Sequence, residues 1–268
     1  MKLIQSVFLG IVQGLTEFIP VSSSAHLNIF PWLFKWENIS ESFDLALHIG
    51  TLFAILCYFY KDFFSLIAGG VKNIYKKEKS QEGKIFWYIV AATIPAGIIG
   101  KLAEDLIGMA VGDNLNIEMI IISAALIIMG VLLYIVDRRM PQEKNYEDSG
   151  FKKLFIIGFS QALAGAVPGV SRSGITMTVA RGYKLNRENA AKFSFLLSAP
   201  MVGGAALLSI GDFAFTPEFF AGVLASFISG LFVIKFLMSF LKKGSYKFFA
   251  VYRVIFGAAI LIIALINI

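Results

Sequence analysis

Cysteine, histidine and charged residues are scarce in this chain of 268 residues. A single cysteine, Cys57, excludes an intrachain disulfide and a metal site built from several thiolates. Charged residues make up 16% of the chain, against about 25% in soluble proteins, while 57% of the residues are hydrophobic. This composition excludes a soluble globular domain and predicts one membrane domain over residues 1–268. Because Cys57 lies in an apolar run, we expect it to be an inert part of the core.

The beginning of the chain and its net charge exclude two further classes. The first 30 residues lack the basic head and small-residue cleavage site of a secretory signal peptide, so we expect none. The net charge of +6 does not indicate a nucleic-acid partner, because the basic residues lie in loops between apolar segments. We therefore expect membrane lipids, and no nucleic acid, among the partners.

Six hydrophobic segments are long enough to cross a bilayer, which takes about 20 apolar residues. They cover residues 43–60, 85–100, 117–136, 190–210, 219–240 and 249–266. Most basic residues lie in the alternate connections 61–84, 138–153, 181–192 and 242–253. The opposite loops are acidic and hold Glu37, Glu41, Glu104, Asp105, Asp113, Asp212 and Glu218. The positive-inside rule therefore places the basic connections in the cytoplasm, with residues 63–75 as an interfacial helix.

Two further apolar segments, 10–33 and 154–182, are broken at a proline and followed by serines. The charge distribution is consistent only if neither crosses, because Lys153 and Arg181 must lie on one side and Lys2 and the loop 35–41 on the other. Re-entrant backbone is tolerated at membrane depth when protein or a wet cavity surrounds it. We thus predict an all-α polytopic membrane protein with six transmembrane helices and two re-entrant helix pairs.

The two broken segments also resemble each other. Four positions match at an offset of 148 residues: Gly10, Gln13, Pro20 and Ser23 with Gly158, Gln161, Pro168 and Ser171. Three spans follow each segment, so the second half is predicted to be inverted. The expected organisation is a pair of inverted repeats, about 1–136 and 151–268, whose broken helices meet at the site.

The first broken segment carries an intramembrane acid and a histidine. Gln13 and Glu17 are spaced i, i+4 and share one face of a helix. Pro20 then ends that helix and is followed by Ser22, Ser23 and Ser24. Ser24 is the expected N-cap of a short helix that carries His26, and such a helix start favours an anion. Charge at this depth costs about 2.5–3.5 kcal/mol per group or more, so it marks a functional site.

The second broken segment supplies a cation at a helix start. Pro168 and Gly169 break the helix, and Ser171, Arg172, Ser173 and Thr176 crowd the start of the next one. The planar guanidinium of an arginine fits phosphate oxygens, and hydroxyl donors flank it here. The two segments together predict a site for an anion with several oxygens, with phosphate as the leading candidate.

Glu17 repels phosphate, so its presence needs a chemical reason. It is a general base, an orienting partner of His26, or a ligand of a divalent cation such as Mg²⁺ or Ca²⁺ that bridges phosphates. This favours an enzyme over simple binding, although Glu17 and Arg172 could also form a structural pair. His48, one turn after Asp44, is interpreted as a structural or supporting residue, and Lys235 as a snorkelling side chain.

Both segments closely resemble the signature motifs of the bacterial undecaprenyl pyrophosphate phosphatase family, which is also known for bacitracin resistance. The residues that carry the resemblance are GLTEFIPVSSSAH and PGVSRSGIT, the second of which matches the family motif at Pro168, Gly169, Ser171, Arg172, Ser173 and Thr176. The resemblance covers the whole chain, including its six-span, two-loop plan. Where relatives carry a second Glu this chain has Gln13, which weakens the expectation of a tightly held divalent cation.

The resemblance implies that undecaprenyl pyrophosphate loses its terminal phosphate at the outer face of the bacterial cytoplasmic membrane. It implies catalytic roles for Glu17, Ser23, His26 and Arg172, with Gln13, Ser22, Ser24, Gly169, Ser171, Ser173 and Thr176 as substrate-binding candidates. Either Ser23 attacks phosphorus with His26 as its base, giving a phosphoserine, or His26 or Glu17 activates a water while Ser23 only holds phosphate. A flippase of undecaprenyl phosphate is the alternative function, because inverted repeats favour alternating access. A second copy of the chain is a candidate partner.

Overall fold

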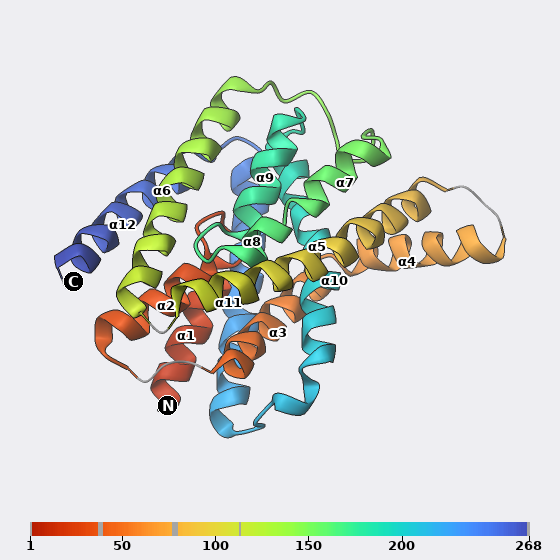
Figure 1. Ribbon diagram of the computed structural model, residues 1–268. Helices are drawn as coiled ribbons and strands as arrows, with labels where there is room; N and C mark the ends of the chain where they lie inside the picture. The colour runs from red at the N-terminus through yellow and green to blue at the C-terminus, as the bar shows by residue number, and fades with distance from the viewer. Residues whose placement is uncertain (1, 37–39, 77–79, 113, 267–268) are drawn as a thin grey trace.

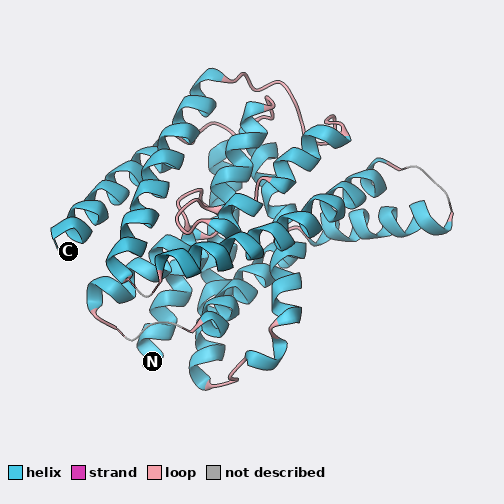
Figure 2. Ribbon diagram, in the orientation of Figure 1, coloured by secondary structure: helices cyan, strands magenta, loops and turns pink. Residues whose placement is uncertain are grey.

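The computed structural model describes residues 2–36, 40–76, 80–112 and 114–266, and this part of the chain is helical with no named strand (Figures 1 and 2). The six helices long and apolar enough to span a membrane are α3 (Glu41–Tyr58), α5 (Gln81–Val111), α6 (Leu115–Arg139), α10 (Arg187–Leu208), α11 (Pro217–Leu241) and α12 (Lys247–Ile266). The prediction of an all-α polytopic membrane protein is therefore confirmed. Glu37, Lys77, Lys79 and Asp113, which contributed to the charge pattern, lie outside the described residues.

Most of these helices begin and end within a few residues of the predicted spans, but α5 does not. It runs for 31 residues instead of the predicted 85–100 and contains Pro95. Its first turns pack against α4 (Tyr60–Tyr75), where the Trp87 indole N–H donates to the Gly70 carbonyl at 3.2 Å. The two helices form an arm that leaves the body of the molecule (Figure 1). The helix expected over 63–75 is thus confirmed, and its place at the membrane interface stays a prediction.

The first broken segment forms a helical hairpin of α1 (Leu3–Thr16) and α2 (Ser23–Phe34). α1 ends at Thr16, before Pro20. The predicted N-cap Ser24 is wrong: Ser22 caps α2, because its Oγ accepts a hydrogen bond from the Ala25 N–H. The sequence shows three consecutive serines, and only the backbone conformation decides which of them precedes the first helical residue.

The second broken segment is interrupted earlier than Pro168. It forms α7 (Phe151–Phe159), a short α8 (Ala162–Ala166) and, after a turn, α9 (Arg172–Gly182). Ser171 caps α9 and its Oγ accepts from the Gly174 N–H at 3.0 Å. Both segments therefore are helix–break–helix units, while their re-entrant placement in a bilayer stays a prediction.

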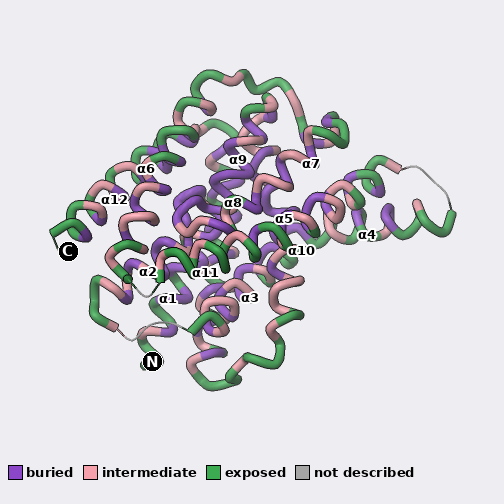
Figure 3. The backbone as a smooth tube through the Cα atoms, viewed as in Figure 1, coloured by how far each residue is buried: buried purple, intermediate pink, exposed green. Residues whose placement is uncertain are grey.

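Each hairpin packs against a long helix from the other half of the chain. α1 lies along α11, and α7 and α8 lie along α5. A side chain at Gly10 or Gly14 would collide with the backbone of α11 at Gly222 or Gly230, and Gly165 of α8 approaches Gly100 of α5 in the same way. Small residues at such contacts let membrane helices approach closely. These contacts hold the two breaks at the centre of the molecule, where buried residues gather (Figure 3).

Two predictions about single residues are wrong. Cys57 is exposed, because it lies on the outward face of the last turn of α3. Arg253, assigned by its position to a cytoplasmic connection, lies inside α12 and is fully buried. Hydropathy counts a buried arginine and a loop arginine alike, so its location required the tertiary structure.

Candidate functional site

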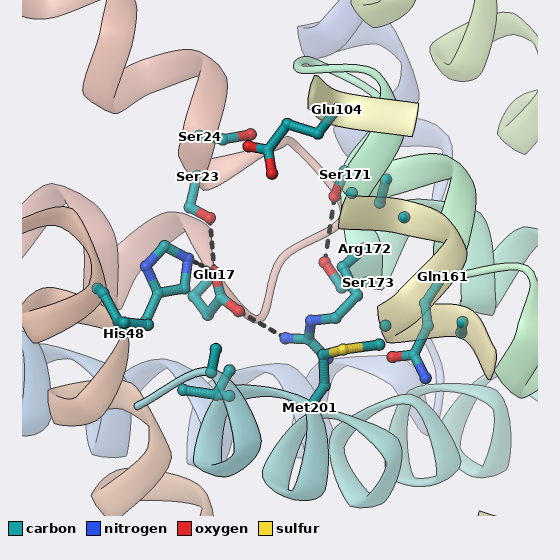
Figure 4. Close-up of a pocket in the computed structure, with 18 of the residues that line it drawn as sticks. Glu17, Ser23, Ser24, His48, Glu104, Gln161, Ser171, Arg172, Ser173 and Met201 are labelled. Atoms are coloured by element: carbon teal, nitrogen blue, oxygen red, sulfur yellow. Dashed lines mark hydrogen bonds and ion pairs between the residues drawn. The ribbon is translucent and has the colours of Figure 1, made fainter. Parts of the chain in front are cut away.

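The two breaks and three of the long helices enclose a cavity of about 350 Å³ (Figure 4). Its polar lining consists of Glu17, Ser23, Ser24, Asp44, His48, Lys101, Glu104, Gln161, Ser171, Arg172 and Ser173. α5 and α10 add a wall of small and apolar residues, among them Ala96, Gly97, Met201 and Val202. The cavity thus has one polar region at the breaks and one apolar wall.

Glu17, the residue after α1, connects the two hairpins through its carboxylate. Its Oε1 accepts from Nη2 of Arg172 at 2.5 Å. Its Oε2 accepts from the Ser23 hydroxyl at 2.5 Å and from Nε2 of Gln13 at 3.1 Å. The i, i+4 spacing of Gln13 and Glu17 therefore does place both side chains together. The carboxylate is only 5% exposed, so these donors replace the water that a buried charge requires.

Arg172 is the first residue of α9 and is held from behind. Its Nη1 donates to the Ser194 carbonyl on α10 at 3.2 Å. The hydroxyls of Thr176 and Ser194 lie 2.7 Å apart, and Thr176 also donates to the Arg172 carbonyl at 2.8 Å. Thr176 is fully buried, so it braces the start of α9 and does not face the cavity. The Nη1 side of the guanidinium is therefore bound to α10, while Nη2 points to Glu17 at the cavity.

Both α2 and α9 begin at the cavity. Ser23 is the first residue of α2 and Arg172 is the first of α9, and each follows a capping serine. Ser173 of α9 donates to the Ile19 carbonyl in the other break at 3.3 Å, which ties the two helix starts together. The first N–H groups of a helix have no partner within it and carry partial positive charge. Two such starts facing one cavity favour an anionic group between them.

Arg253 of α12 joins the two breaks from the side away from the cavity. Its guanidinium donates to the carbonyls of Pro20 in the first break and of Gly169 and Val170 in the second, at 3.1, 2.9 and 2.9 Å. Its Nε donates to the Leu126 carbonyl at 3.3 Å. Gly169 has φ +91°, and a side chain there would collide with Ile122. Gly169 therefore shapes the break and presents its carbonyl to Arg253.

His26 does not line the cavity, although the sequence analysis placed it among the catalytic candidates. It is 2% exposed, its Nδ1 lies 2.7 Å from the Ser22 carbonyl, and its Nε2 lies 2.7 Å from the Tyr252 hydroxyl. Its ring stacks on Phe256. Ser22 and Gln13 are likewise buried behind the lining. In this structure His26 fixes the beginning of α2.

Five polar lining residues were not among the candidates, namely Asp44, His48, Lys101, Glu104 and Gln161. His48 of α3 lies beside Glu17 and Gln161 lies on the opposite side (Figure 4), and Asp44 lines the cavity one turn before His48. Gln161 is 2% exposed, and neither atom of its amide has a hydrogen-bond partner in the described part of the chain. The sequence signal for the first two was an acid and a histidine one turn apart inside a span. For Gln161 the signal was its match to Gln13.

The described residues do not fit a divalent cation held by the protein alone. Nowhere among them do three His, Cys, Asp or Glu side chains lie close enough to bind one ion. Glu17, the ligand considered from sequence, already accepts from Ser23, Gln13 and Arg172. A cation here would need oxygens from another molecule to complete its coordination.

The chain is similar to one protein family and to several named relatives. The sequence model of the family described as bacitracin resistance protein BacA matches residues 6–259. A relative from Moorella thermoacetica is 41% identical over 263 residues, with 97% of each chain covered, and is named undecaprenyl-diphosphatase. Relatives of the same name from Caldicellulosiruptor bescii and Elusimicrobium minutum are each 42% identical, covering 97% and 99% of both chains.

Proposed function

The chain belongs to the bacitracin resistance protein BacA family, and from this premise we propose that it hydrolyses undecaprenyl diphosphate to undecaprenyl phosphate and phosphate. The observation that carries the proposal is the junction of Glu17, Ser23 and Arg172 at two facing helix starts. This arrangement combines an activated hydroxyl with donors for phosphate oxygens. Such donors stabilise the charge of a transferring phosphoryl group.

The diphosphate binds between the starts of α2 and α9 in this proposal. The guanidinium of Arg172, which holds Glu17 in the structure, turns part of its donor edge to the terminal phosphate. Ser171, which lines the cavity beside it, adds a hydroxyl donor, and so does Ser173 once its hydroxyl turns from the Ile19 carbonyl. The prenyl chain leaves along the apolar wall of α5 and α10, where Gly97 and Ala205 leave room for it. This orientation places the scissile anhydride near Ser23.

Ser23 is the nucleophile in this mechanism and Glu17 is its base. The Ser23 hydroxyl already donates to Oε2 of Glu17 at 2.5 Å, which is the geometry that general-base activation requires. A phosphoserine at the first position of α2 would lie at the positive end of that helix. The competing route, an activated water with Ser23 only holding phosphate, has no comparable contact in its favour.

Phosphate release tests the function. Purified protein in detergent with undecaprenyl diphosphate is expected to release phosphate, and Arg172→Ala and Glu17→Gln are expected to lower kcat at least about 10²–10³-fold. Undecaprenyl phosphate as substrate is the control and should release none. If the protein in vesicles moves undecaprenyl phosphate across the membrane and no phosphate is released from the diphosphate, the protein is a flippase and not a hydrolase.

The nucleophile is tested by trapping the enzyme during turnover of a substrate labelled in the terminal phosphate. Label on Ser23, and its loss in Ser23→Ala, are expected. Ser24→Ala is the matched control, because Ser24 lines the same cavity without contacting Glu17. Substantial turnover by Ser23→Ala together with an unlabelled protein would favour water as the nucleophile.

Location, cation and assembly complete the proposal. The acidic loops, with Asp212 and Glu218, face the outside of the cytoplasmic membrane, so the cavity opens there. In a Cys57→Ser background, an impermeant thiol reagent should then label Phe215→Cys but not Lys243→Cys in whole cells.

A divalent cation, Mg²⁺ or Ca²⁺, would arrive with the diphosphate. A homodimer stays a prediction, and light scattering in detergent, which gives the mass of the protein, tests it.

A further inference from the structure

His48 stands on the cavity wall in the middle of α3, next to the carboxylate of Glu17 (Figure 4). Its Nδ1 lies 3.0 Å from the Asp44 carbonyl oxygen. A carbonyl only accepts, so Nδ1 carries a hydrogen and Nε2 is the nitrogen whose protonation is free to change. Nε2 lies 3.5 Å from Oε2 of Glu17. The backbone of α3 thereby fixes the tautomer that points a titrating nitrogen at the proposed base.

Three groups surround Oε2 of Glu17: Ser23, Gln13 and His48. Oε2 accepts the Ser23 proton at 2.5 Å and faces Nε2 of His48 at 3.5 Å. A neutral Nε2 and a carboxylate oxygen are both acceptors, so the pair is stable only when a proton lies on one of them. The hydroxyl, the carboxylate and the imidazole therefore form one path for a proton.

His48 also has a route to water, which His26 lacks. The His48 side chain is 20% exposed, and it faces the cavity. Both ring nitrogens of His26 already have partners, and its ring is 2% exposed. Of the two histidines in the chain, only His48 can take a proton from Glu17 and pass it on.

Charged groups from several elements line the cavity around His48. On its own helix, an Asp44 carboxylate oxygen lies 3.8 Å from Nδ1. Glu17 after α1 and Glu104 of α5 add negative charge at the cavity, while Arg172 of α9 and Lys101 of α5 oppose it. A proton on Nε2 of His48 would face the Glu17 carboxylate at 3.5 Å, with Asp44 one turn away on α3.

We propose that His48 is the proton carrier of the reaction, working through Glu17. When the Ser23 oxygen bonds to the terminal phosphorus, the bond from phosphorus to the bridging oxygen breaks, and its electron pair leaves with undecaprenyl phosphate. The Ser23 proton passes to Glu17 and on to Nε2 of His48. Water then attacks the phosphorus of the phosphoserine as the bond from phosphorus to the Ser23 oxygen breaks. The proton of this water passes to Glu17, which returns it to the Ser23 oxygen. The one proton that hydrolysis releases leaves by His48 into the cavity.

The test rests on the proposed hydrolysis, so phosphate release by the wild-type protein is established first. His48→Gln keeps an N–H donor for Glu17 but cannot titrate. It is expected to lower kcat about 10²-fold or more, with KM little changed, and to remove one limb of the pH profile of kcat. His26→Gln is the matched control, which should retain that limb even if its activity falls.

A second variant tests whether the loss of activity comes from lost packing at His48 or from the lost imidazole. His48→Ala leaves space beside Glu17, and added imidazole is expected to restore turnover, more strongly as pH rises through the titration of imidazole. A wild-type kcat and pH profile for His48→Gln, or a folded His48→Ala that imidazole does not rescue, would overturn the proposal. In either case phosphate release by the wild-type protein would stand, so failure here is distinct from failure of the proposed function.

Discussion

Ser22 and Ser171 hold the same place in the two breaks. Their backbone angles are φ 75°, ψ 94° and φ 73°, ψ 115°, and each hydroxyl caps the helix that follows. Counted from each cap, Ser23 corresponds to Arg172 and Ser24 to Ser173. Two segments far apart in the chain therefore build the same turn, and they put different chemistry at its first helical position.

The correspondence differs slightly from the predicted one. Gln13 and Gln161 match at an offset of 148, but the capping serines match at 149, because Gly169 adds a residue to the second break. The predicted partner of Ser23, namely Ser171, is therefore wrong by one position. The inverted relation of the whole halves stays a prediction.

Outside the caps the two hairpins diverge. The residue matching Glu17 in the second hairpin is Gly165, where the backbone closes on Gly100 of α5. The residue matching His26 is Ile175. In the proposed mechanism the first hairpin holds the base and the nucleophile, and the second holds the cation. Neither hairpin carries all three groups, so the proposed phosphate site needs both hairpins at one cavity.

Arg253 is expected to show the largest effect, since it contacts both breaks. Arg253→Met removes the donor of four carbonyls, each of which costs about 1–3 kcal/mol when buried without a partner. We expect a large fall in thermal stability in detergent together with loss of turnover.

Arg253→Lys is the comparison variant for that experiment. An ammonium keeps the charge but cannot span carbonyls of both breaks as the planar fork does. The Arg253→Lys protein should therefore have a thermal stability between those of the wild type and Arg253→Met. If Arg253→Met melts at the wild-type temperature, Arg253 does not hold the two breaks together.

The two capping serines should give similar, intermediate effects. Ser22→Ala and Ser171→Ala each lose a cap worth about 1 kcal/mol and keep a positive φ that disfavours a side chain. Glycine at either position loses the cap but relieves the backbone, so the Gly variants should melt above the Ala variants. Thermal denaturation of the four variants measures this, and unequal effects at the two positions would break the equivalence of the two turns.

Substitutions of the matched glutamines, Gln13 and Gln161, should have the smallest effects, and the two should differ in kind. Gln13 donates to Glu17, whereas the amide of Gln161 faces the cavity without a partner in the described part of the chain. Gln13→Ala is expected to lower kcat several-fold, and Gln161→Ala to raise KM with little change in kcat. Steady-state phosphate release gives both constants, and the same split for both variants would show that Gln161 does not contact substrate.

Short-range patterns predicted part of the site. The spacing of Gln13 and Glu17 and the helix starts after each break appear in the structure, as does the approach of the two broken segments to each other. Helical spacing and the charge distribution along the chain suffice for these, because each depends on neighbours in sequence or on the side of the membrane.

The partners of the two histidines could not be predicted in the same way. Which ring faces the cavity depends on how α2 and α3 rotate against α12 and α1, and Tyr252 engages His26 from 226 residues away. The burial of Arg253 depends likewise on carbonyls that only the two breaks expose.

The two broken segments, the six long apolar helices and the polar residues within apolar segments are determined by the sequence alone, since each reflects local composition. The tertiary structure decided which polar groups share the cavity. Glu17 meets Arg172 and His48 there because α11 packs on the first hairpin, α5 packs on the second, and Arg253 binds both breaks. A buried charge is tolerated only where distant donors converge on it, and no stretch of sequence contains that convergence.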